Sequence, residues 1–146
     1  MVNAEASVVI QRPVEEVFGV VQDVSKIPMW QSVMVEGRQL TDGPFGVGTK
    51  LVMSGSLLGK RFDIEAEIIE HEPNRSFVSK STGGPLEMTS RLACEPVEGG
   101  TRFIQQVEGQ AHGFFKVGYP VLTRVARRQL ENSAATLKDL LEADAI

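Results

Sequence analysis

The stretch GPFGVGTK, Gly43 to Lys50, has the residue types that bind phosphate groups. A phosphate loop has two glycines separated by four residues, then Lys, then Ser or Thr, so that backbone N–H groups and the ammonium hold the phosphates. Gly43 and Gly48 have this separation, but Thr49 precedes Lys50, which reverses the ammonium and the hydroxyl. A phosphate loop also leads into a helix, whereas LVMSGSLL after Lys50 continues as a strand. The sequence therefore predicts a turn between two strands here.

Three carboxylates lie two residues apart in one segment, at Asp63, Glu65 and Glu67. Paired carboxylates can act as acid and base when their surroundings separate their pKa values. The residues between and beside them, such as Phe62 and Ile64, are apolar. In a strand these two sets point to opposite faces, so the pattern places the acids in water on an outer sheet face.

Histidine and cysteine are the other residue types that could carry chemistry. His71 is predicted at a turn and His112 in the connection before the last helix, and their spacing gives no metal-ligand cluster. Cys94 alternates with Leu92 in a predicted strand and has no evident base as partner, so we expect a small buried apolar residue. The sequence therefore predicts neither a metal nor a cofactor.

Composition indicates one globular domain over residues 1–146, with 42% hydrophobic and 23% charged residues. The net charge of −4 argues against nucleic-acid binding, which depends on Lys and Arg. A single cysteine excludes an internal disulfide. No segment resembles a signal peptide or a membrane span, so we expect a cytoplasmic protein.

The first elements that must position these residues are a strand and two short helices. Residues 4–11 are predicted as a strand, and Pro13 suits the first turn of a helix that ends near Asp23. Ser25 is expected to cap a second brief turn, SKIPMW. Six further strands, separated by short turns, are predicted at residues 32–40, 49–58, 60–71, 75–81, 86–97 and 101–110.

A helical period returns from about Phe114 to Ala143, and Gly118 and Pro120 interrupt its start. The helix either begins at Pro120 or is kinked there. One side is lined by Leu122, Ala126, Leu130, Ser133, Leu137 and Leu141. The long helix is the only element able to cover the apolar face of a seven-stranded antiparallel sheet, so we expect an α+β fold in which the curved sheet wraps around that helix. The two short helices would close one end of an internal cavity.

This order of elements, with its motifs, resembles the SRPBCC superfamily of START-like helix-grip proteins, which includes polyketide cyclase/dehydrase and lipid-transfer members. The matching motifs are RPVEEVFGVVQDVSKIPMW, GVGTK, EHEPNRSF, EGGTRF and VLTRVARRQLENSAATLKDLLE. The resemblance spans nearly the whole chain. It implies a deep, largely apolar cavity that accepts lipids, sterols, polyketides or similar small hydrophobic molecules.

Binding or transport of such a molecule is the function that the resemblance favours, with Tyr119 or Arg124 orienting a polar end. The candidate ligand-binding residues are Trp30, Met53, Phe62, Phe77, Met88, Phe115, Tyr119 and Leu122. Methionine and phenylalanine suit a site for apolar ligands, but they also fill solid cores. Trp30 has two interpretations, a plug between the short helices and the sheet or a wall of the ligand site. Access is expected past Gly83 and Gly84 and past the start of the last helix.

The alternative is a cyclase or dehydratase acting in the same cavity without metal or cofactor. Such an enzyme needs a proton donor or acceptor within reach of its substrate. The candidates are Tyr119, His112, Gln105, Ser90 and Arg91. A third interpretation is a protein-interaction module that uses the helix surface.

A basic cluster also has two interpretations. It comprises Lys116, Arg124, Arg127 and Arg128. These side chains could meet anionic lipid headgroups in a transient membrane contact, or they could form the solvated face of a helix.

Overall fold

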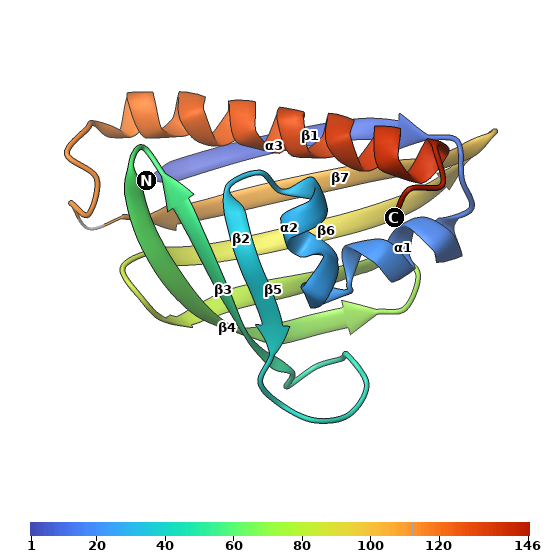
Figure 1. Cartoon of the computed structure of the whole chain (residues 1–146), viewed down its shortest axis with the longest axis horizontal. Helices are drawn as coiled ribbons and strands as arrows, with labels where there is room; N and C mark the ends of the chain where they lie inside the picture. The colour runs from blue at the N-terminus through green and yellow to red at the C-terminus, as the bar shows by residue number, and fades with distance from the viewer. Residues whose placement is uncertain (112) are drawn as a thin grey trace.

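The computed structural model describes residues 1–111 and 113–146. Figure 1 shows a curved sheet with one long helix lying across it and two short helices beside it. In chain order the elements are β1 (Val2–Ile10), α1 (Val14–Val21), the 3-10 turn η1 (Val24–Lys26), α2 (Ile27–Trp30), β2 (Met34–Gln39), β3 (Lys50–Leu57), β4 (Lys60–Glu72), β5 (Ser76–Gly83), β6 (Glu87–Val97), β7 (Gly100–Gln110) and α3 (Tyr119–Glu142). The predicted helix-grip arrangement is confirmed.

The seven strands form one antiparallel sheet in the order β1-β7-β6-β5-β4-β3-β2. Strands β2 to β7 are therefore a meander, and β1 joins it at the far edge beside β7. The pairing of β4 with β5 shifts register between Glu65 and Ala66 and again between Ile68 and Glu70. Such bulges bend a strand and increase its twist, and they help the sheet curve around α3.

Strand β4 has the expected alternation. Phe62 and Ile64 are buried, whereas Asp63 and Glu65 are exposed. The exposed carboxylates thus lie on the convex, solvated face of the sheet, as the sequence predicted, and the apolar side chains lie on the concave face that α3 covers.

Helix α3 packs its apolar stripe against the concave face and runs along β1 (Figure 1). Leu137 and Leu141 are almost fully buried in the largest core cluster, and each such burial stabilises the fold by roughly 1.5–3 kcal/mol. The helix begins at Tyr119, with Gly118 as its N-cap and Pro120 in the first turn. Of the two predicted alternatives, the start at Pro120 is therefore right to within one residue. The helical period noted from Phe114 overstates the helix, because residues 113–118 are irregular and proline fits a first turn, where no N–H is needed.

The turn between α1 and α2 is capped differently from the prediction. Asp23, not Ser25, is the N-cap, because its Oδ1 accepts hydrogen bonds from the Ser25 backbone N–H (3.1 Å) and from Ser25 Oγ (2.6 Å). Asp and Ser are about equally good N-cap residues, but Asp23 has the extended backbone of an N-cap (φ −79°, ψ 100°), whereas Ser25 lies inside the turn.

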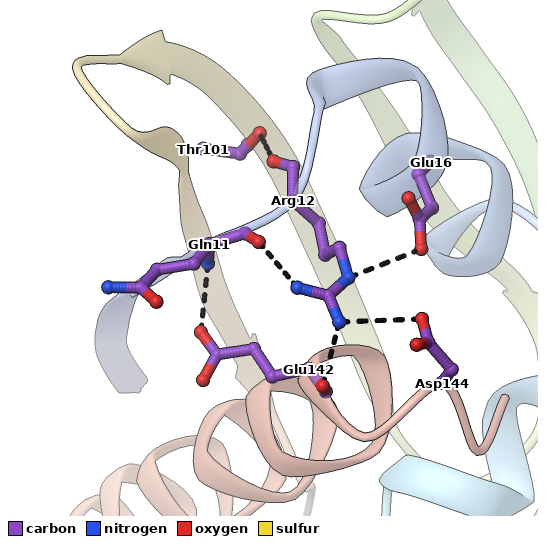
Figure 2. Close-up of polar contacts among 6 residues, drawn as sticks. All are labelled: Gln11, Arg12, Glu16, Thr101, Glu142 and Asp144. Atoms are coloured by element: carbon purple, nitrogen blue, oxygen red, sulfur yellow. Dashed lines mark hydrogen bonds and ion pairs between the residues drawn. The ribbon is translucent and has the colours of Figure 1, made fainter.

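A polar network fastens the end of α3 to the β1–α1 junction (Figure 2). Arg12 Nη2 donates to the backbone carbonyl of Glu142 at 2.7 Å and lies 3.4 Å from Asp144 Oδ1, while its Nε is 3.8 Å from Glu16 Oε1. The backbone N–H of Gln11 donates to Glu142 Oε2 at 2.8 Å. A cation at the C-terminal end of a helix complements its dipole, so the network fixes where α3 ends over the sheet.

The stretch GPFGVGTK connects β2 to β3, and β3 follows it directly, so it lacks the helix that a phosphate loop requires. Gly43 and Gly48 have φ values of 97° and 89°, which glycine adopts without strain. The Gly48 N–H donates to the carbonyl of Ile68 at 2.8 Å. The loop folds back against β4, as expected of a turn.

Candidate functional site

A cavity of about 160 Å³ lies between the concave face of the sheet and α3. Its lining comes from β3 to β7, from the α1–β2 region and from one face of α3, so it draws on all three apolar clusters of the core. An apolar cavity of about 150 Å³ is large enough to bind benzene. The space therefore holds roughly one aromatic ring without rearrangement.

Most of the wall is aliphatic or aromatic. Leu51, Ile64 and Leu92 form part of the sheet side, and Leu130 closes the cavity from α3. Met53 also lines it, and unbranched methionine can change rotamer to suit ligands of different shape. A ligand that enters such a cavity gains about 25 cal/mol of binding free energy per Å² of apolar surface removed from water.

A small group of polar side chains interrupts this wall on three neighbouring strands. Ser79 on β5 lies directly opposite Ser90 on β6, and Gln105 on β7 lies opposite Leu92, two residues along β6 from Ser90. All three polar residues line the cavity. Because diagonal neighbours of this kind face the same side of a sheet, they form one polar strip across an apolar surface.

Gln105 is the most buried member of this strip, with 3% of its surface exposed. Its Oε1 atom has no hydrogen-bond partner among the described residues. A buried polar atom without a partner costs about 1–3 kcal/mol, and most buried polar atoms avoid that cost by pairing. The cavity thus contains an amide that is ready to hydrogen-bond to a guest.

None of the described residues that line the cavity is titratable. The lining can hydrogen-bond and exclude water, but within the described part of the chain it offers no side chain that exchanges a proton near neutral pH. Cys94, on the same strand as Ser90, does not line the cavity, and burial raises the pKa of its thiol to about 12. It is a buried apolar residue, as predicted.

Four predicted ligand-binding residues lie together in the cavity wall. They are Met53, Phe62, Phe77 and Met88. They come from β3, β4, β5 and β6, and the sequence showed a clear alternation of inward and outward side chains for Phe62 on β4. Their contact with a ligand remains a prediction.

The other four predicted residues lie outside the lining. Trp30 is buried edge-to-face against Phe103, with ring centroids 5.6 Å apart, which matches its interpretation as a plug. Phe115 and Leu122 belong to an apolar cluster of which other members, such as Phe62, line the cavity. Tyr119 is 38% exposed at the start of α3. Arg124, expected as an alternative partner for a polar ligand group, is likewise exposed on that helix.

The residues considered for catalysis are dispersed. Gln105 and Ser90 line the cavity, whereas Arg91 is exposed. His112 lies outside the described residues. His71 Nε2 is 3.3 Å from Gln22 Oε1, and within the described residues no group of three or more His, Cys, Asp or Glu side chains could hold a metal ion.

Phe45 is a wall residue that the sequence analysis missed. It comes from the loop GPFGVGTK and packs edge-to-face on Phe77, with ring centroids 5.0 Å apart. It also contacts His71, at 5.4 Å between centroids. The available signal was a lone aromatic residue between glycines, which is unusual for a turn that only reverses the chain.

Comparison with known proteins agrees with this architecture. The model of a family described as polyketide cyclase/dehydrase and lipid transport matches residues 1–142. No match was found among the curated proteins. None of the helices in the described ranges is long and apolar enough to cross a membrane.

Solved structures with similar folds span nearly the whole chain. A START superfamily protein from Mycobacterium smegmatis has a TM-score of 0.83 and 16% identity, with 97% of each chain covered. The protein TTHA0849 from Thermus thermophilus has a TM-score of 0.82 and 14% identity, with 99% of each chain covered. The di-domain ARO/CYC BexL of the BE-7585A biosynthetic pathway has a TM-score of 0.71 and 22% identity, over 97% of this chain and 47% of that one.

At these identities the structures establish the fold, and the family model establishes the family. The chain belongs to the polyketide cyclase/dehydrase and lipid transport family, with the SRPBCC-type fold that its motifs resemble.

Proposed function

We propose that this protein binds a small hydrophobic molecule in the cavity between the sheet and α3. The observation that carries the proposal is an apolar cavity of about 160 Å³. None of the described residues that line it has a titratable side chain. A family that includes lipid transport supports it. The domain would act as a cytoplasmic carrier or receptor formed by residues 1–146.

A cyclase or dehydratase is the weaker candidate. The family description includes that chemistry, and BexL shares the fold. However, general acid–base catalysis needs a group whose pKa lies near the working pH, within hydrogen-bond reach of the substrate. The described cavity wall offers Ser90 and Gln105 instead, which suit recognition.

We propose that the ligand enters and leaves the cavity at the end of the molecule where α3 begins. Val117, Tyr119 and Val121 are exposed there, beside exposed Lys116 and Arg124. Apolar side chains flanked by cations are complementary to an anionic bilayer surface. Transient membrane contact at this end predicts co-sedimentation with phosphatidylserine vesicles that is lost at high salt. Equal sedimentation with neutral vesicles would contradict it.

Filling the cavity tests the binding proposal directly. Ala126 lines the cavity from α3, whereas Ala135 is exposed on the same helix. Ala126→Leu should weaken the binding of benzene, toluene or naphthalene at least tenfold, because its added methyl groups occupy the ligand's space. Ala135→Leu is the matched control and should bind like the wild-type protein.

Binding can be measured by calorimetry and by the fluorescence of Trp30, the single tryptophan. The proposal predicts saturable binding of at least one member of the series. It is wrong if the wild-type protein binds none of them, or if Ala126→Leu binds them all unchanged.

A further inference from the structure

Gln105 places an amide group in the cavity wall. The carbonyl oxygen of this amide has no hydrogen-bond partner among the described residues. The Gln105 side chain projects from β7 into the lining, is 3% exposed, and has no partner for Oε1. Methionine or leucine would fill the same volume without that penalty, so packing alone gives no reason for an amide here.

The surroundings of Gln105 restrict what could satisfy it. Ser90 lies diagonally across on β6, with Ser79 opposite Ser90, and both also line the cavity. These groups are neutral, and so is every described residue of the lining. A charged guest would therefore be buried without a counter-ion, which costs far more than one hydrogen bond returns.

An amide carries a donor and an acceptor, and rotation about its terminal torsion exchanges them. A hydroxyl group likewise donates one hydrogen bond and accepts others. A hydroxyl on an apolar body therefore matches Gln105 in either orientation, whereas a carbonyl group on the ligand could only accept.

We propose that Gln105 is a hydrogen-bonding subsite that selects neutral, apolar ligands carrying a hydroxyl group, of which a phenol is the simplest. This inference rests on the proposed function. It explains how the cavity would distinguish a hydroxylated ligand from a hydrocarbon of the same shape. The hydrocarbon leaves the Gln105 oxygen without a hydrogen bond, and the hydroxylated ligand does not.

Phenol and toluene are the matched probes, because a hydroxyl replaces a methyl on the same ring. Calorimetry at pH 7 gives the ratio of the toluene Kd to the phenol Kd for each protein. Gln105→Met, which keeps the side-chain volume, should lower this ratio about tenfold. Gln106→Met is the control, since Gln106 is exposed on the opposite face of the same strand. Gln105→Leu repeats the test in case one variant folds poorly, and circular dichroism checks the fold of each.

The outcomes separate this inference from the proposed function. If the wild-type protein binds neither probe nor any hydrocarbon of the series, both fail. If it binds both probes and the ratio is unchanged in Gln105→Met and Gln105→Leu, the cavity binds apolar ligands but Gln105 pairs only with water, and the subsite is wrong. Benzoate, which has the same ring with a charge, should not bind at pH 7. Binding as tight as that of phenol would overturn the requirement for neutrality.

Discussion

Gln105 combines a cost in stability with the role in ligand recognition that we propose for it. It is buried in an apolar wall with an unpartnered carbonyl oxygen. Ser90 and Ser79 on the adjoining strands extend the polar strip, yet they leave that oxygen unpaired. In the ligand-free protein the amide is therefore an energetic cost, and only a guest or a water molecule that hydrogen-bonds to it removes the cost.

Replacing Gln105 by Met should make the ligand-free protein more stable by about 1 kcal/mol, because the desolvated oxygen is removed while the volume is kept. Urea unfolding followed by circular dichroism measures the difference. Gln106→Met, on the exposed face of β7, removes a solvent-exposed hydrogen bond to Glu5, so it should lower the free energy of unfolding slightly, by at most about 1 kcal/mol. A destabilised Gln105→Met would show that the amide is already satisfied without a ligand.

Only some of the ligand-binding residues predicted from sequence line the cavity, and the reason lies in how individual side chains pack. Alternation along β4 identified Phe62 as inward-facing, whereas Met53 and Met88 were selected by residue type, because methionine suits a site for apolar ligands. Trp30 and Phe115 are just as apolar and as buried, but they pack into the core beside the cavity. The sequence pattern determines whether a side chain points into the protein or toward solvent. Whether an inward side chain lines the cavity or packs against another side chain depends on elements that are distant in sequence.

At the scale of elements, α3 was the easiest to recognise and the hardest to delimit. Its apolar stripe predicted the helix and its buried face. Its start depended on whether Pro120 lay inside the helix or in the first turn, which periodicity cannot distinguish. Its far end is fixed by contacts with residues distant in sequence, such as Arg12, and these become evident only in the folded chain.

The contacts at that far end depend on pH. The hydrogen bond from Lys138 and then that from the Gln11 N–H lower the pKa of the Glu142 carboxyl from its ordinary 4.5. The folded protein therefore favours the charged form, and the unfolded chain takes up the proton more readily. This contribution to stability is present above about pH 4.5 and is lost as the pH falls through the lowered folded-state pKa.

Glu142→Gln should consequently reduce the free energy of unfolding at pH 7 and reduce the loss of stability between pH 7 and pH 3. Urea titrations at the two pH values measure both quantities. Glu131→Gln makes the same charge change at an exposed position of α3 and is the control. Parallel pH profiles for the wild-type protein and Glu142→Gln would contradict the assignment.

At the scale of the whole molecule, the fold was largely predictable because each level of the sequence agrees with it. Periods of two and of 3.6 residues divide the chain cleanly, and short turns leave a meander as the economical arrangement of strands. The pairing of β1 with β7 could not be predicted from local pattern, because no turn connects these two strands, and it became evident only in the folded chain.

Cys94 offers a measure of how the whole molecule opens. It is 1% exposed, and burial raises the pKa of its thiol to about 12, so the folded protein should be almost inert to a thiol reagent at pH 8. Labelling should then follow unfolding of the domain. A bound ligand at 100 times its Kd should slow labelling about a hundredfold. Mass spectrometry of the labelled protein measures the rate, and Cys94→Ala provides the blank. Labelling that stays fast in the presence of a proven ligand would indicate local opening of the sheet instead.

The position of β1 has a consequence for how the protein is made. Val2 pairs with Gly109 and Ile10 with Thr101, so β1 leaves the ribosome well before its partner strand β7 has been synthesised. At ordinary rates of translation the delay is on the order of ten seconds. During that time a segment rich in valine has unsatisfied backbone groups, which is the condition for pairing with another nascent chain. The charge at Glu5, in the middle of this strand, opposes such an encounter in the unfinished chain, and it does the same at the sheet edge that β1 forms in the folded protein.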